Sequence, residues 1–254
     1  MPKPNNAGIT PIHIAAEVGN LEILDLLLKQ PNANINIYDG CGITPLTHLI
    51  YTLREPLGSR LDESTITKGI NTIKFLLSKR ANPDGRDPEF KKALRETLPL
   101  KTALTIDPRI VGPYRIPLVM AAVADNAEIV KILLEAGADV NCSGHSQETA
   151  LYIAVSRGNL EIVKILLDQP EIEVNMLTRQ KQTPLAAAVI AFNNSQRRNN
   201  TNKLDNFIAV IKLLLEKGAN PNIPDMIGRT LLDRVTEINN KDLSSIFDKY
   251  AAKF

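Results

Sequence analysis

The residues best suited to catalysis in this sequence are a cysteine and a histidine three positions apart, Cys142 and His145. A histidine close to a cysteine can remove the thiol proton and leave a nucleophilic thiolate. The short segment between them offers no third group to orient the imidazole, and we expect it to be an exposed connector. The two cysteines of the chain, Cys41 and Cys142, also lack the spacing of metal ligands. We therefore predict no catalytic residue, no metal site and no cofactor.

Other chemical signatures point the same way. The chain has no glycine-rich phosphate loop and no triad motif, and the acidic pair Asp62 and Glu63 is expected to be solvated. The net charge is only +2, and aromatic residues are 4% of the chain. Stacking platforms for bases are therefore lacking, so we expect no nucleic acid partner. We also expect no membrane span and no secretory signal, and hence a cytoplasmic protein. We expect the protein to be a monomer.

The composition predicts a thin core. The chain has 254 residues and is 44% apolar, yet it contains no Trp. A round globule of this length, which is near the upper limit for one growing core, would use more large rings to fill its centre. Aliphatic side chains must therefore form most of the buried surface.

The sequence repeats itself in three phrases. The first phrase, typified by Thr-Pro at residues 10–11, predicts a capped helix start, since Thr can cap backbone N–H groups and Pro suits the first turn. The second, typified by residues 19–28 and 158–167, has the apolar spacing of a helix. The third phrase closes the repeat and runs from a Gly to an Asn, as in Gly137 to Asn141. The Gly suits the left-handed position just after a helix. The first phrase starts at Thr10, Thr44, Ile116, Thr149, Thr183 and Thr230, with a smallest spacing of 33 residues.

These phrases resemble the ankyrin repeat family. The resemblance implies an all-α solenoid of stacked antiparallel helix pairs, with finger-like connectors and a polar last repeat. It also implies that His13 links neighbouring turns by hydrogen bonds. We expect one domain over residues 1–254, and we place its six units at about 6–41, 42–85, 114–142, 143–178, 179–222 and 223–254.

Three insertions interrupt the repeat. Residues 51–68 and 192–205 lie between the two helices of a unit, whereas residues 86–113 replace a connector between units. The apolar spacing of the first insertion suggests that it lengthens both helices. The second is rich in Asn and is expected to be a mobile loop. The third is expected to project on the finger side, either as part of a binding face or as a tolerated surface loop.

The resemblance implies binding to a protein through finger tips and the concave face of the first helices. Charge suggests an acidic partner, because residues 179–222 hold seven Lys or Arg and only two Asp or Glu. Arg179, Lys181, Arg197, Arg198 and Lys203 would form this basic patch; an ordinary solvated surface is the alternative. The candidate contact residues are Tyr38, Asp39, Tyr114, His145, Arg157, Met176, Arg179, Lys181, Arg197, Arg198, Met226 and Arg229.

Two further expectations come from the resemblance. Asn141 lies eight residues after Leu133, as in ankyrin sequences that asparaginyl hydroxylases modify, so it is a candidate for hydroxylation; a plain turn-forming role is the alternative. We predict a non-catalytic scaffold. Two other functions remain open: the targeting part of a larger enzyme, and an effector that an intracellular bacterium secretes into the cytoplasm of its host.

Overall fold

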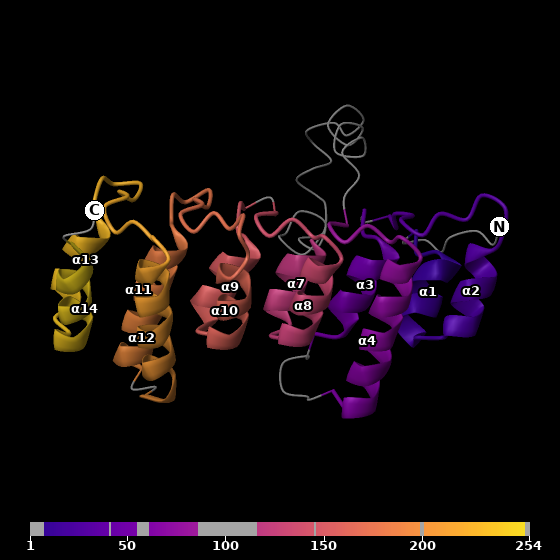
Figure 1. Cartoon of the computed structure of the whole chain (residues 1–254), viewed down its shortest axis with the longest axis horizontal. Coiled ribbons are helices and arrows are strands. Elements are labelled where there is room, and N and C mark those ends of the chain that lie inside the picture. The colour runs from indigo at the N-terminus through magenta and orange to yellow at the C-terminus, as the bar shows by residue number, and fades with distance from the viewer. Residues whose placement is uncertain are drawn as a thin grey trace. The chain divides into compact units, whose positions relative to one another are not determined.

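The computed structural model describes residues 8–40, 42–54, 61–85, 116–144, 146–198 and 201–251. In this part of the chain the structure is all α-helical, with paired helices and no β-strand, as predicted (Figure 1). The chain divides into two compact units, residues 1–145 and 146–254, which are described one at a time. Unit 1 contains α1 (Pro11–Val18), α2 (Leu21–Leu28), α3 (Pro45–Thr52), α4 (Glu63–Ser78), α7 (Pro117–Val123) and α8 (Ala127–Glu135). Unit 2 contains α9 (Ala150–Arg157), α10 (Leu160–Leu167), α11 (Pro184–Arg197), α12 (Thr201–Glu216), α13 (Leu231–Ile238) and α14 (Lys241–Ala251).

Helices begin where the repeated phrases predict. The Thr183 hydroxyl accepts a hydrogen bond from the Ala186 amide at 3.1 Å, and Pro184 occupies the first turn of α11. Second helices start at a repeated asparagine, since the Asn159 side chain accepts from the Ile162 amide at 2.9 Å. These caps therefore start the helices at the same point of the repeat, although α7 begins after Ile116, which makes no side-chain cap.

Within each unit, neighbouring helix pairs bury aliphatic side chains against one another. In unit 1, α3 packs against both α1 and α7, and in unit 2, α11 packs against both α9 and α13. Leu24, Ile73 and Val130 occupy matching places in the second helices of unit 1, and all three are fully buried. The thin aliphatic core expected from the composition is present.

Between helix pairs the chain forms a short hairpin-like finger. The Asp39 amide donates to the Ile43 carbonyl at 3.0 Å, and the Ile43 amide donates to the Asp39 carboxylate at 2.8 Å. The last finger repeats both bonds, because Asp225 and Arg229 pair in the same way at 2.9 and 3.0 Å. The same turn therefore occurs in two fingers, and in each it is held by an aspartate five residues before the starting Thr.

The closing residues of the repeats join one helix pair to the next. The Asn82 amide donates to the Asn36 side chain at 2.7 Å, and the Asp139 amide donates to the Asp84 carboxylate at 2.8 Å. The second bond spans the long insertion at residues 86–113, which lies outside the described residues. The repeat after this insertion therefore keeps the register of the repeat before it.

The first intra-repeat insertion, residues 51–68, lengthens one helix and not two. Helix α4 has 16 residues, as predicted, but α3 ends at Thr52 after eight residues. The next residue, Leu53, is buried, and a side chain on Gly69 of α4 would collide with it. Packing of Leu53 against α4 thus takes the place of a longer α3.

The predicted mobile loop at residues 192–205 is wrong. Helix α11 continues to Arg197 and α12 already begins at Thr201, so the insertion lengthens both helices. Phe192 is 2% exposed, because it continues the apolar face of α11 into the core. The burial of this ring outweighs the low helix propensity of the neighbouring asparagines.

His13 links two repeats, as the resemblance implies. Its Nε2 donates to the Ile43 carbonyl at 2.9 Å, and its Nδ1 accepts from the Thr10 hydroxyl at 2.8 Å. The ring is fully buried and stands edge-on to His48, whose Nε2 lies 3.2 Å from the Glu17 carboxylate. This pattern requires a neutral imidazole with its proton on Nε2.

Titration of His13 gives a first prediction. Burial lowers the pKa of His13 below 6.5, although the Ile43 carbonyl and Asp39 act in the opposite direction. The unfolded chain therefore takes up this proton first, and stability is lost as pH falls below about 6.5. Urea unfolding between pH 7.5 and 5 should show this loss in the wild type and in His48→Gln. It should be reduced in His13→Gln; an unchanged slope in that variant would contradict the assignment.

The glycine after α9 gives a second prediction. Gly158 has φ +71°, and a Cβ there would lie 2.9 Å from the buried Phe207 ring. Gly218 has φ +88° with open space around it, so it serves as the matched control. Gly218→Ala should cost about 1 kcal/mol of backbone strain. Gly158→Ala should cost a further ~1–3 kcal/mol for overpacking. If both variants lose the same free energy of unfolding in denaturant, the Phe207 ring moves aside without destabilising the core, and the prediction is wrong.

Candidate protein-binding surface

The finger of the first repeat uses one predicted contact residue for its own structure. Asp39 is half-buried, and its carboxylate is held by the Ile43 amide. Tyr38 beside it is also half-buried. The predicted contacts Tyr114 and His145 lie outside the described residues. In unit 1, Asp39 therefore shapes the finger that would present Tyr38.

Unit 2 exposes the predicted residues of its first long finger. Arg179 and Lys181 are exposed, and Leu177 is 40% exposed although it is apolar. Met176 is half-buried. Lys181 has φ +52°, a left-handed conformation, and its amide donates to the Thr178 carbonyl at 2.9 Å. The tight turn thus holds two cations and one apolar side chain at the tip.

The last finger presents an apolar pair. Met226 and Ile227 are 66% and 70% exposed, the highest values among the large hydrophobic residues that are described. The Ile227 amide donates to the Asp225 carboxylate at 2.9 Å, and Gly228 follows with φ +80°. Two neighbouring apolar side chains are therefore held in solvent by the turn itself, which is typical of a contact site.

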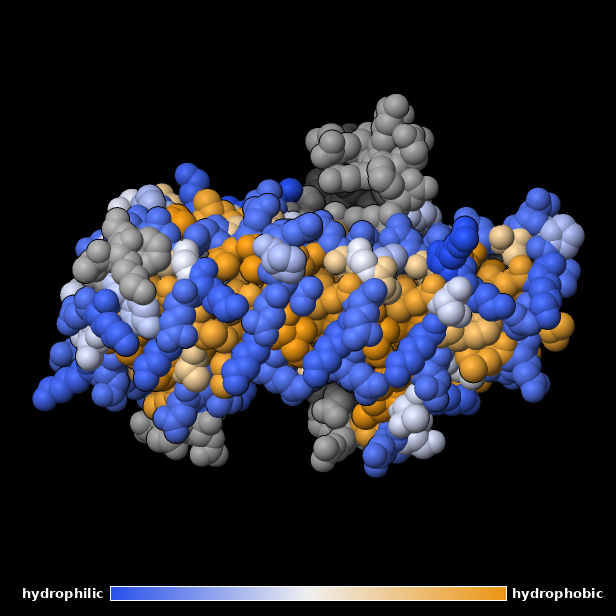
Figure 2. All heavy atoms as spheres, in the orientation of Figure 1, coloured by the Kyte–Doolittle hydropathy of each residue, from blue (hydrophilic) through white to orange (hydrophobic). Residues whose placement is uncertain are grey.

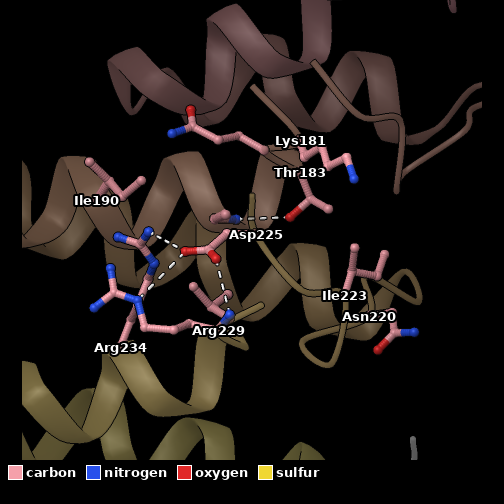
Figure 3. A pocket seen from close by; sticks show the side chains of 11 residues that line it. Lys181, Thr183, Ile190, Asn220, Ile223, Asp225, Arg229 and Arg234 are labelled. Atoms are coloured by element: carbon pink, nitrogen blue, oxygen red, sulfur yellow. Dashed lines mark hydrogen bonds and ion pairs between the residues drawn. The ribbon is translucent and has the colours of Figure 1, made fainter. Parts of the chain in front are cut away.

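A shallow cleft lies between these two fingers and the helices that follow them. One wall comes from Lys181, Gln182 and α11, and the other from Ile223, Asp225 and α13 (Figure 3). The space inside it is about 20 Å³, enough for a water-sized group. The cleft is far too small for a typical small-molecule ligand.

Charge in the cleft centres on Asp225. Arg234 donates to its carboxylate at 2.6 Å, and Arg229 Nε lies 3.8 Å away, so both guanidinium groups converge on it (Figure 3). The hydrogen bond from Arg234 is the main cause that lowers the pKa of Asp225 to about 2. Glu237 lies 3.5 Å from Arg229 on the outer side. Together with Lys181, the three cations outnumber the two carboxylates, and the cleft carries a positive charge.

Arg229 has one N–H donor that makes no hydrogen bond to the described residues. Its Nε is buried and has no hydrogen-bond partner among the described residues, which is a costly state for a charged group. The sequence identified Arg229 as a contact but not Arg234, which lies on α13 where four of the five earlier repeats have alanine or an apolar residue and the second has His48. The opposite charges of Asp225 and Arg234, which are nine residues apart, are the sequence signal that could have identified Arg234.

The predicted basic patch is split in two. Arg179 and Lys181 lie on the finger before α11, whereas Arg197 and Arg198 lie at the far end of that helix. Fourteen helical residues separate the two groups by about 20 Å. Lys203 lies near the start of α12, with the far group. Arg157 is exposed at the last turn of α9, so it is a separate candidate.

Of the residues considered for chemistry, Cys41 and His145 lie outside the described residues. Cys142 is half-buried, and its amide donates to the Asp139 carbonyl at 3.1 Å. Asn141, the candidate for hydroxylation, is half-buried in the same turn and its amide donates to the Asp139 carboxylate. The described residues contain no group of His, Cys, Asp or Glu that could hold a metal ion. Nor do they contain a helix long and apolar enough to cross a membrane.

Comparison with known sequences identifies the repeats. Models described as ankyrin repeats match residues 2–49 and 118–225. The chain is 29% identical over 130 residues to the ankyrin repeat protein YahD of Escherichia coli K12, a match that covers 51% of this chain and 60% of YahD. It is 32% identical over 152 residues to human inversin, covering 52% of this chain and 14% of inversin. The chain thus accounts for less than two thirds of these relatives.

Solved structures show the same architecture over nearly the whole chain. An ankyrin repeat domain from Acinetobacter baumannii AYE aligns with a TM-score of 0.69 and 21% identity, covering 95% of this chain and 97% of that domain. A second ankyrin repeat protein aligns with a TM-score of 0.66 and 20% identity, covering 94% and 96%. With paired helices, capped starts and fingers in place, the chain belongs to the ankyrin repeat family.

Proposed function

We propose that this chain binds an acidic protein through the two neighbouring fingers of unit 2 and the cleft between them. Ankyrin repeats generally act as protein–protein interaction modules and are typically non-catalytic. The observation that carries the proposal is the combination of exposed apolar tips with a positively charged cleft. Exposed apolar side chains favour the centre of an interface, and charges around them favour its rim.

The apolar part of the surface provides affinity. Leu177, Met226 and Ile227 are large, exposed and held on fingers whose turns are fixed by backbone hydrogen bonds. A fixed turn reduces the ordering cost that a flexible loop would incur on binding. These three side chains are therefore the proposed anchor residues.

The charged part provides selectivity. Arg179 and Lys181 are exposed, and the Arg229 side chain is 41% exposed, so a carboxylate of the partner has several donors within the cleft region. Asp225 stays ionised and holds Arg234 and Arg229 in place. Complementary charge also accelerates association and makes it sensitive to salt.

The third prediction tests this surface with a control of equal charge change. Arg179→Glu with Lys181→Glu should abolish affinity capture of the acidic partner from a cell extract, since it reverses the charge at the cleft. Arg197→Glu with Arg198→Glu, at the far end of α11, should leave capture unchanged. Met226→Asp with Ile227→Asp should weaken the complex at least about tenfold, as loss of anchor residues does.

Quantitative mass spectrometry of the captured proteins, repeated at about 50 and 300 mM salt, provides the readout. Capture by the wild type should fall at the higher salt concentration. The proposal is wrong if the finger variants capture the same proteins as the wild type. It is also wrong if only the variant at residues 197 and 198 loses them.

A further inference from the structure

The first repeat exposes an apolar face that the other repeats of its unit cover. Ile14 and Val18 are four residues apart on α1, and Ile23 and Leu26 are three apart on α2; these four side chains, which we call the N face, are 47–59% exposed. Leu21 adjoins them at 37%. The space-filling view shows hydrophobic surface over α1 and α2 (Figure 2). Exposed apolar side chains gathered in this way mark an interaction surface.

The N face occupies the place of a repeat–repeat interface. Ile14 corresponds to Met120 of α7 in the repeat alignment, and Ile23 corresponds to Ile129 of α8. Met120 and Ile129 are fully buried within unit 1, whereas Ile14 is 49% exposed and Ile23 is 47% exposed. The described residues of unit 1 place no helix pair on the outer side of α1 and α2. The surface is therefore shaped to receive a helix pair.

In place of the monomer expected from the sequence, we propose that two copies of this chain pair through their N faces. The last repeat offers no complement, since the exposed positions described on α14 are Lys241, Asp242, Ser245, Asp248 and Lys249. Head-to-tail stacking would thus set an apolar face against a polar one. A twofold dimer sets each apolar face against its own copy and closes the assembly.

Charge on α2 is complementary in this arrangement. By helix periodicity, Glu22 and Lys29 lie on the same side as Leu26, at either end of it. Both residues are exposed, and Lys29 also contacts Asp25 at 2.6 Å. When α2 lies antiparallel to α2 of the second copy, Glu22 of each chain faces Lys29 of the other. Two identical ion pairs then flank the apolar contact.

The size of the N face sets the strength of the dimer. Its side chains expose a few hundred Å² in each copy, so the dimer with its polar rim buries roughly 1,000 Å² in total. That area is at the low end of specific interfaces, where weak and transient complexes are found.

The fourth prediction uses sedimentation equilibrium of the full chain from about 1 to 500 µM. The average mass of the wild type should rise from 28.0 kDa toward twice that value. Ile14→Glu with Ile23→Glu should remain at 28.0 kDa, because each copy would then bury a charge. Met226→Glu with Ile227→Glu, which alters exposed apolar residues on unit 2, should dimerise like the wild type.

A charge exchange tests the pairing itself. Glu22→Lys alone and Lys29→Glu alone should each weaken the dimer at least about tenfold, since like charges then face each other twice. An equimolar mixture of the two variants should recover wild-type association, because the mixed dimer restores both pairs. A wild type that stays at 28.0 kDa overturns the proposal, and so does a mixture no stronger than its separate components.

Discussion

The structure depends on the burial of aliphatic side chains between neighbouring helix pairs. A pair such as α7 and α8 is too small to cover its own apolar side, so each pair is stable only against another. Met120 and Ile129 are fully buried because a preceding pair covers them, and Ile14 and Ile23 are exposed because none does in the described residues. Packing against a neighbouring helix pair therefore accounts for the core where the neighbour is present. Where the described residues provide no such neighbour, the apolar side of the first repeat is exposed.

Much of the fold could be predicted because its signals are local. The Thr183–Pro184 start and the Asn159 cap need only a few residues, and the structure has helices beginning at both. The asparagines of residues 192–205 predict a loop because they have low helix propensity, whereas residues 192–197 are helical because Phe192 is buried in the core. Sequence patterns identify helix starts better than they identify how far packing extends a helix.

The sequence predicts the fingers of the candidate binding surface but not the cleft between them. The fingers of unit 2 and their residues Arg179 and Met226 follow from the repeat register. The cleft does not, because it needs Arg234 of α13 to approach Asp225. The distance of about 20 Å between Arg197 and the finger does not follow either, because it depends on the length of α11. The proposed binding residues Leu177, Met226 and Ile227 are exposed, so the packing that fixes the helices does not determine which side chains stand there.

Hydrogen exchange at a concentration low enough to prevent self-association would test the central claim most directly, since that claim makes stability a property of neighbouring pairs. In unit 1, amides of α3, which packs on two sides, should exchange more slowly than those of α1 and α2. In unit 2, amides of α11 should likewise exchange more slowly than those of α13 and α14. Equal protection of terminal and inner pairs, or greater protection of α1 and α2, would contradict the account.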